Sequence, residues 1–185
     1  LPDALRQDVI DRMIRPTLEA MQSYSGILYA GLMLTADGPK LVEYNVRFGD
    51  PETQVILPRM ETDLMDILIA IRDHRLGEVT IKWRPLVSAS VVLVSDTYPA
   101  KVEIGKEIFG LQEAAKINDV TVYHAGTRLE DGHVYTAGGR VLNVTAVGST
   151  LKEALEKAYF VAEMVDFEGK DYRRDIGQKG LVKNR

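Results

Sequence analysis

Residues 41–52 read Leu-Val-Glu-Tyr-Asn-Val-Arg-Phe-Gly-Asp-Pro-Glu, and the first seven of them have the pattern of a β-strand. Side chains alternate between the two faces of a strand, so Glu43, Asn45 and Arg47 are predicted to share one face. The residues between them are predicted to share the other face and to lie in the core: Val42, Tyr44 and Val46. The first face therefore carries a carboxylate, an amide oxygen and a guanidinium side by side.

These three polar side chains suit a cation that is bound to a phosphate. Mg²⁺ and Mn²⁺ prefer oxygen ligands and are often held by one or two protein groups, with phosphate oxygens and water completing the shell. Glu43 and Asn45 are the candidate metal ligands, and Arg47 is the candidate for stabilising charge on a transferred phosphoryl group. An isolated triplet of this kind is more often an exposed strand face whose mixed charges stay solvated.

The residues that follow weaken the solvated-face interpretation. Gly49 permits unusual backbone angles, and Asp50 and Glu52 stand just before a helix that is predicted to begin near Thr53. Each carboxylate alone is also explained by the positive end of a helix dipole. Asp50 and Glu52 are therefore candidate substrate contacts with a structural alternative.

The composition limits the class of protein. The chain has 185 residues, of which 45% are hydrophobic and 27% charged, which is typical of a globular protein rather than a disordered or membrane-spanning one. The formal charge of −4 includes no long basic block, so nucleic acid is not an expected partner. The chain contains no cysteine, which excludes disulfides and thiolate chemistry, and no apolar run is long enough for a membrane span. Cytoplasm is the expected location.

Two domains are expected. A helix over residues 2–22, disturbed at Pro16, precedes a hairpin of residues 27–35 and 40–47, and a helix over 63–76 is predicted to end at Gly77. Short β-branched segments then predict a mostly antiparallel sheet: residues 88–95, 120–125, 133–137 and 141–147. A last helix is expected to begin at Ser149 or Thr150. The fold class is α+β, with a boundary expected between residues 84 and 85.

The whole pattern resembles a known family. Residues 41–54 look like the signature region of phosphoribosylamine-glycine ligase, also called glycinamide ribonucleotide synthetase, which belongs to the ATP-grasp ligases. The likeness extends to four further segments: residues 29–35, 37–40, 137–141 and 172–177. The resemblance implies that residues 1–84 are the C-terminal part of an ATP-grasp domain and that residues 85–185 are the C-terminal domain of the ligase.

The resemblance also implies an activity, in purine biosynthesis. ATP phosphorylates the carboxylate of glycine, and the amine of 5-phosphoribosylamine attacks the glycyl phosphate to give glycinamide ribonucleotide, ADP and phosphate. Glu43 and Asn45 fall on the family's Mg²⁺ or Mn²⁺ ligands, Arg47 on the arginine beside the transferred phosphate, and Asp50 and Glu52 on the substrate side. A glycine-rich turn of the C-terminal domain suits an anionic sugar phosphate, although an ordinary hairpin turn is its alternative: Gly138, Gly139 and Arg140.

The chain is expected to be a fragment. It begins with Leu1 rather than methionine, and no glycine-rich nucleotide loop precedes Glu43, so the N-terminal half of the enzyme is an expected partner. We expect the chain by itself to bind ATP poorly and to catalyse nothing. Two alternatives stay open, namely another ATP-grasp carboxylate-amine ligase and a non-catalytic module that retains the fold.

Overall fold

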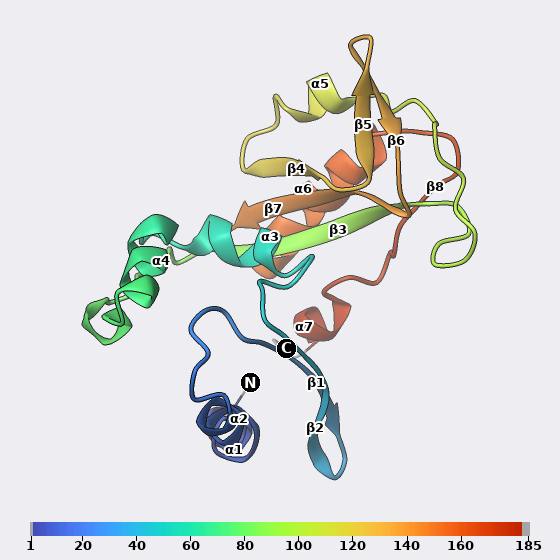
Figure 1. Ribbon diagram of the computed structural model, residues 1–185. Helices are drawn as coiled ribbons and strands as arrows, with labels where there is room; N and C mark the ends of the chain where they lie inside the picture. Colours follow the sequence, from blue (N-terminus) through green and yellow to red (C-terminus); the bar gives the residue numbers. More distant parts are fainter. Residues whose placement is uncertain (1, 183–185) are drawn as a thin grey trace. The chain divides into compact units, whose positions relative to one another are not determined.

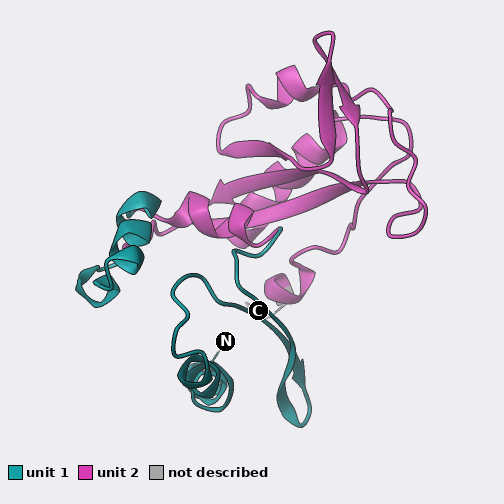
Figure 2. Ribbon diagram, viewed as in Figure 1, with its two compact units in different colours: residues 1–50, 62–81 teal, residues 51–61, 82–185 magenta. Residues whose placement is uncertain are grey.

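The computed structural model describes residues 2–182, and the chain divides into two compact units. Unit 1 comprises residues 1–50 and 62–81, and unit 2 comprises residues 51–61 and 82–185 (Figure 2). Residues 51–61 belong to unit 2, so the chain passes between the units three times. The domain boundary between residues 84 and 85 stays a prediction. Within the described residues, no helix is long and apolar enough to cross a membrane.

Unit 1 begins with the predicted N-terminal helix, which changes its winding around Pro16. The helix consists of α1 (Asp3–Val9), the π-helical turn η1 (Ile10–Ile14) and α2 (Arg15–Ala20) (Figure 1). Proline has no amide hydrogen and its ring clashes with the preceding turn, so the regular hydrogen-bond ladder is interrupted there. The predicted disturbance is therefore confirmed, and it takes the form of a wider turn rather than a break.

The predicted hairpin is also confirmed, with shifted ends. Strands β1 (Tyr29–Thr35) and β2 (Gly38–Asn45) pair antiparallel. Gly31 pairs with Glu43, but the next pair is Leu32 with Leu41, so Val42 is the extra residue of a β-bulge.

The prediction that Val42, Tyr44 and Val46 form a core row was wrong. The side chains of Val42 and Val46 are 65% and 62% exposed, because Val42 is the bulge residue and Val46 lies beyond the end of β2. Tyr44 is half-buried: its hydroxyl donates to the carbonyl oxygen of Met13 at 2.9 Å and accepts from Thr17 at 2.8 Å. Tyr44 thus ties β2 to the π-helical turn.

Helix α4 (Leu64–Arg72) ends differently from the prediction. Asp63 caps its start by accepting from the amide of Met65 at 2.8 Å. At its end the amide of Arg75 donates to Ala70 at 2.8 Å and that of His74 donates to Ile71 at 3.2 Å. This is a Schellman motif in which His74, with φ of 57°, takes the left-handed position that glycine usually fills. Gly77 is therefore not the cap and lies in the 3₁₀ turn η3 (Leu76–Glu78).

Unit 2 is built on a four-stranded antiparallel sheet with the strand order β4-β7-β3-β8 (Figure 1). Its strands are β3 (Val87–Ser95), β4 (Val120–His124), β7 (Arg140–Gly148) and β8 (Lys170–Asp171). A separate hairpin pairs β5 (Thr127–Glu130) with β6 (His133–Thr136). The helices are α3 (Thr53–Ile56) with the 3₁₀ turn η2 (Leu57–Arg59), α5 (Leu111–Ala114), α6 (Leu151–Met164) and α7 (Gln178–Val182). The four predicted strands are confirmed, whereas β5, β8, α5 and α7 were not predicted.

The core of unit 2 lies between this sheet and α6. Ala89, Val91 and Leu93 alternate along β3 and are buried, and α6 packs across β3 and β7 with its own buried face (Figure 1). The buried residues of α6 recur at helical spacing: Ala154, Leu155, Ala158, Val161 and Ala162. The period of two on the strand and the period of 3.6 on the helix meet in one apolar layer.

Both ends of α6 are capped by side chains. Thr150 accepts from the amide of Glu153 at 3.2 Å, which confirms one of the two predicted caps. Glu153 in turn accepts from the amide and the hydroxyl of Ser149 at 2.8 and 2.7 Å. At the other end the ammonium of Lys170, 13% exposed, donates to three helix carbonyls: those of Ala162, Glu163 and Val165, at 3.2, 3.5 and 2.6 Å.

Replacing Lys170 with methionine should destabilise the chain. The substitution keeps the apolar stem but leaves helix carbonyls without their donor, which costs about 1–3 kcal/mol. Chemical denaturation measures the change. Lys152→Met on α6 is the matched control, because Lys152 is 75% exposed and its ion pair with Glu156 is long, at 3.7 Å. Equal stability of the two variants would contradict the capping role.

Glu153 should contribute a pH-dependent part of the stability. Hydrogen bonds from Lys157 and Ser149 lower the pKa of Glu153 from its ordinary value of 4.5 to about 2. The folded state thus binds this proton less readily than the unfolded chain, so the contribution is complete above pH 4.5 and is lost as the pH falls towards 2. Melting temperatures of the wild type and of Glu153→Gln should differ above pH 4.5 and converge near pH 2. A difference that stays constant with pH would show that Glu153 acts by other means.

Candidate functional site

The predicted metal ligands lie side by side at the end of β2. The amide nitrogen of Asn45 donates to a carboxylate oxygen of Glu43 at 3.1 Å. Gly31 lies opposite Glu43 on β1, and a Cβ added there would come within 3.2 Å of Glu43 Cγ. The absence of a side chain at position 31 therefore gives the Glu43 side chain room over β1.

Arg47 and Asp50 follow this pair in the chain. Arg47 was predicted to share the strand face of Glu43, but β2 ends at Asn45 and the guanidinium donates to the carbonyl of Phe48 at 2.8 Å. The strand alternation therefore does not extend to Arg47, and its catalytic role stays a prediction. Asp50 is exposed at the last position of this part of unit 1.

The Glu43–Asn45 pair fits a hard cation. It offers the second carboxylate oxygen of Glu43 and the amide oxygen of Asn45, and Mg²⁺ or Mn²⁺ sites beside phosphates often use only one or two protein oxygens. Within the described residues no group of three or more His, Asp or Glu side chains is placed to hold a metal ion. Two protein oxygens fill only part of the coordination shell of Mg²⁺ or Mn²⁺, and phosphate oxygens and water commonly supply the rest.

Unit 2 contains a hollow of about 510 Å³ that gathers three arginines and one aspartate. We call it the arginine cavity. Its polar and aromatic lining consists of Ser90, Tyr98, Arg140, Asp171, Tyr172, Arg173 and Arg174, and its apolar lining of Pro51, Val92, Val94 and Ile176.

The sheet decides where this cavity forms. Ser90, Val92 and Val94 alternate along β3 with the buried residues that face α6, so they lie on the opposite face of the strand. Arg140 begins β7 and pairs with Val94, which places the predicted arginine at the cavity. Arg140 is half-buried, and the predicted turn thus contributes a cation to the lining.

The other two arginines come from the segment after β8. The guanidinium of Arg174 lies 5.0 Å from the centre of the Tyr172 ring and 3.6 Å from Asp171. Arg173 makes two hydrogen bonds to Asp175, at 2.9 and 2.8 Å, and these lower the pKa of the Asp175 carboxyl. Burial raises the pKa of the Tyr172 phenol, so the ring stays neutral beneath the arginine. Arg173 and Arg174 were not among the predicted site residues, although residues 172–177 belong to the family likeness; the sequence signal is two adjacent arginines after a tyrosine.

Gly138 and Gly139 pack beside the cavity without lining it. A Cβ on Gly139 would lie 2.4 Å from the Tyr98 ring, and the carbonyl of Gly138 accepts from the hydroxyl of Ser95 at 3.1 Å. Gly139 thus makes room for Tyr98, which does line the cavity. Direct contact of the two glycines with a substrate stays a prediction.

Glu52 lines a smaller hollow of about 260 Å³ next to the arginine cavity. Three residues line both hollows, so the two are neighbours: Pro51, Ser90 and Ile176. Glu52 and Arg140, both predicted to contact substrate, are therefore brought to adjoining spaces of unit 2.

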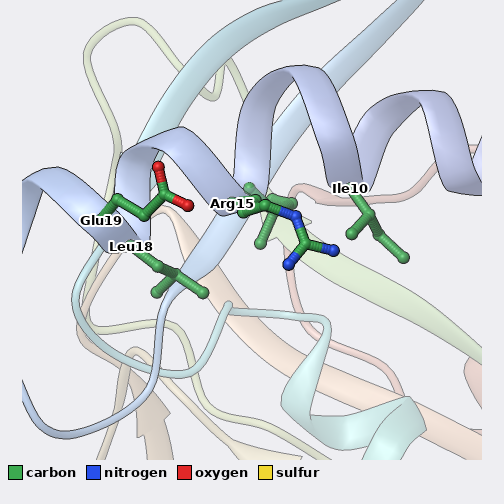
Figure 3. Close-up of a pocket in the computed structure, with 5 residues that line it drawn as sticks. Ile10, Arg15, Leu18 and Glu19 are labelled. Atoms are coloured by element: carbon green, nitrogen blue, oxygen red, sulfur yellow. The ribbon is translucent and has the colours of Figure 1, made fainter.

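A further hollow, of about 410 Å³, lies along the N-terminal helix of unit 1 (Figure 3). It is lined by Ile10, Ile14, Arg15, Leu18 and Glu19. Arg15 forms a 3.4 Å ion pair with Asp11, and the other lining is mostly apolar, so this surface lacks the convergent polar groups of a ligand site.

Comparison with known proteins connects both units to one family. Residues 1–53 match the model of the phosphoribosylglycinamide synthetase ATP-grasp (A) domain, and residues 88–179 match that of the C domain. The phosphoribosylamine-glycine ligase of Brucella melitensis is 42% identical over 177 residues, and that of Vibrio parahaemolyticus is 44% identical over 180 residues. These alignments cover 94% and 95% of the chain but 42% of each relative, so the chain spans about two-fifths of their length.

Solved structures agree in fold. The phosphoribosylamine-glycine ligase of Thermotoga maritima matches with a TM-score of 0.71 and 37% identity, covering 91% of this chain and 42% of that one. The N5-carboxyaminoimidazole ribonucleotide synthetase of the same organism matches with a TM-score of 0.61 at 17% identity over 90% of this chain and 43% of that one, which supports the fold alone. The chain belongs to the phosphoribosylglycinamide synthetase family, of which it carries part of the ATP-grasp domain and the C domain.

Proposed function

We propose that the whole protein is an ATP-dependent carbon-nitrogen ligase that joins glycine to 5-phosphoribosylamine in purine biosynthesis. The terminal phosphoryl group of ATP passes to the glycine carboxylate and ADP leaves. The amine then attacks the acyl carbon, loses a proton and displaces phosphate, which gives glycinamide ribonucleotide. The observation that carries the proposal is the similarity to phosphoribosylamine-glycine ligases across nearly the whole chain, with Glu43, Asn45 and Arg140 all present.

Unit 1 supplies one wall of the nucleotide site in this proposal. Glu43 and Asn45 hold Mg²⁺ or Mn²⁺, and the ion supplies charge neutralisation for the phosphates when it is bound. Arg47 stabilises the negative charge that spreads over the transferred phosphoryl group. The glycine-rich nucleotide loop of the opposite wall belongs to the remaining part of the protein, which is the partner that the activity requires. The cytoplasmic location stays a prediction.

Unit 2 supplies the site for the sugar phosphate. A phosphate monoester carries close to two negative charges at neutral pH, and arginine pairs with it through two parallel hydrogen bonds. Arg140, Arg173 and Arg174 give the arginine cavity this character, and Tyr98, which is exposed, offers a ring surface to the ribose. Glu52 of unit 2 is the proposed substrate carboxylate here, and Asp50 is the one that unit 1 contributes; a carboxylate suits the ammonium group of glycine.

Replacing Glu43 with glutamine in the complete enzyme should lower turnover about 100-fold or more, because the metal loses a charged oxygen ligand. The binding of Mn²⁺ in the presence of ADP, followed by electron paramagnetic resonance, should weaken in parallel. Glu19→Gln, which changes an exposed carboxylate of the same unit, is the control and should behave like the wild type. Full activity of Glu43→Gln would instead favour a non-catalytic module.

Replacing Arg174 with glutamine should raise KM for 5-phosphoribosylamine about 10- to 100-fold, the loss expected for a hydrogen-bonded charge pair. The KM values for ATP and glycine should stay unchanged in steady-state kinetics. Arg128→Gln is a closely matched control, because Arg128 also lies over a tyrosine ring, at 5.5 Å from the centre of Tyr135, and pairs with a carboxylate, Glu130. An unchanged KM for the sugar phosphate in Arg174→Gln would remove the arginine cavity from the proposal.

A further inference from the structure

Residues 173–176, which carry two of the cavity arginines, form an exposed turn. Burial of its side chains therefore does not fix its position. Arg173, Arg174 and Asp175 are all exposed, and the ion pair between Arg173 and Asp175 lies within the turn. Exposed ion pairs of this kind add little rigidity. The placement of Arg174 therefore depends on contacts that the turn makes with buried structure.

Tyr159 of α6 supplies such contacts on both sides of Arg174. Its hydroxyl donates to the carbonyl oxygen of Arg173 at 2.9 Å and accepts from the amide of Ile176 at 3.0 Å. One phenol thus satisfies one backbone group before Arg174 and one after it. The two bonds use the single donor and an acceptor lone pair of the hydroxyl, so neither competes with the other.

The rest of α6 supports this clamp. Leu155 lies one turn before Tyr159 on the same helix face, and a Cβ on Gly177, where φ is 75°, would lie 2.7 Å from a Leu155 methyl group. The backbone at Gly177, directly after the turn, therefore packs closely against α6. On the entry side the buried ring of Tyr172 lies 6.2 Å from the Tyr159 ring and beneath the Arg174 guanidinium.

We propose that Tyr159 is a positioning residue for the sugar phosphate: its hydroxyl holds the backbone of residues 173–176 so that Arg174 is presented to the arginine cavity. This inference rests on the proposed function, since it assigns the phosphate of 5-phosphoribosylamine to that cavity. Tyr159 itself does not line the cavity and touches no reacting atom in this scheme. Because the turn is already fixed, less conformational entropy is lost when the arginine is ordered by substrate binding.

The test is Tyr159→Phe in the complete enzyme, which removes the hydroxyl and keeps the ring against Tyr172. KM for 5-phosphoribosylamine should rise about 5- to 30-fold, the effect of two hydrogen bonds of ordinary strength. The inhibition constant of ribose 5-phosphate, which retains the phosphate but lacks the amine, should rise by the same factor. The kcat at saturation and the KM values for ATP and glycine should stay at wild-type levels. Tyr135→Phe on β6 removes a tyrosine hydroxyl elsewhere in unit 2 and should change none of these constants.

Two outcomes would overturn the positioning role. One is an unchanged KM and inhibition constant in Tyr159→Phe. The other is an equal loss for all three substrates together with a lower melting temperature, because a purely structural role would not single out the sugar phosphate. The Arg174→Gln variant separates this failure from a failure of the proposed function. If Arg174→Gln raises KM and Tyr159→Phe does not, only the positioning role is wrong; if neither variant does, the assignment of the phosphate to the cavity is wrong.

Discussion

The burial of one face of β3 beneath α6 is the constraint on which unit 2 depends. Ala89, Val91 and Leu93 must face the helix to leave water, and the pleat then turns Ser90, Val92 and Val94 to the other side. A one-residue shift in the register of β3 would turn Ser90, Val92 and Val94 towards α6 and so remove them from the lining of the arginine cavity. Stability and the shape of the candidate site are therefore set by the same alternation.

The same helix also connects the core with the exposed arginines. Its buried face packs on the sheet, its C-terminal carbonyls are held by Lys170, and Tyr159 holds the turn after β8. Hydrogen bonds at the edge of an apolar layer cost little desolvation free energy. They also fix the orientation of the groups that they join, which apolar packing by itself does not do. An exposed cation can thus be placed by a buried framework without being buried itself.

In unit 1 a polar contact links the hairpin to the N-terminal helix. The hydroxyl of Tyr44 ties the hairpin to the π-helical turn, while Val42 and Val46 stay exposed within the described residues. The bulge at Val42 interrupts the register directly before Glu43, and Gly31 leaves space opposite it. The hydrogen bond between Asn45 and Glu43 therefore lies in the last part of β2, where the register with β1 is regular.

The sequence by itself determined the α+β class, the hairpin, the main strands of unit 2 and the family, and it narrowed the cap of α6 to Ser149 or Thr150, because these follow from periodicity, turn residues and local motifs. It also placed Glu43 beside Asn45, since two residues on one strand share a face. The tertiary structure decided the rest: His74 rather than Gly77 ends α4, Arg47 leaves the strand row, and Arg140 meets Arg174 in one cavity. Some of these features depend on contacts between residues distant in sequence. In the others, two local conformations have similar free energies and tertiary packing decides between them, so no local sequence pattern encodes the outcome.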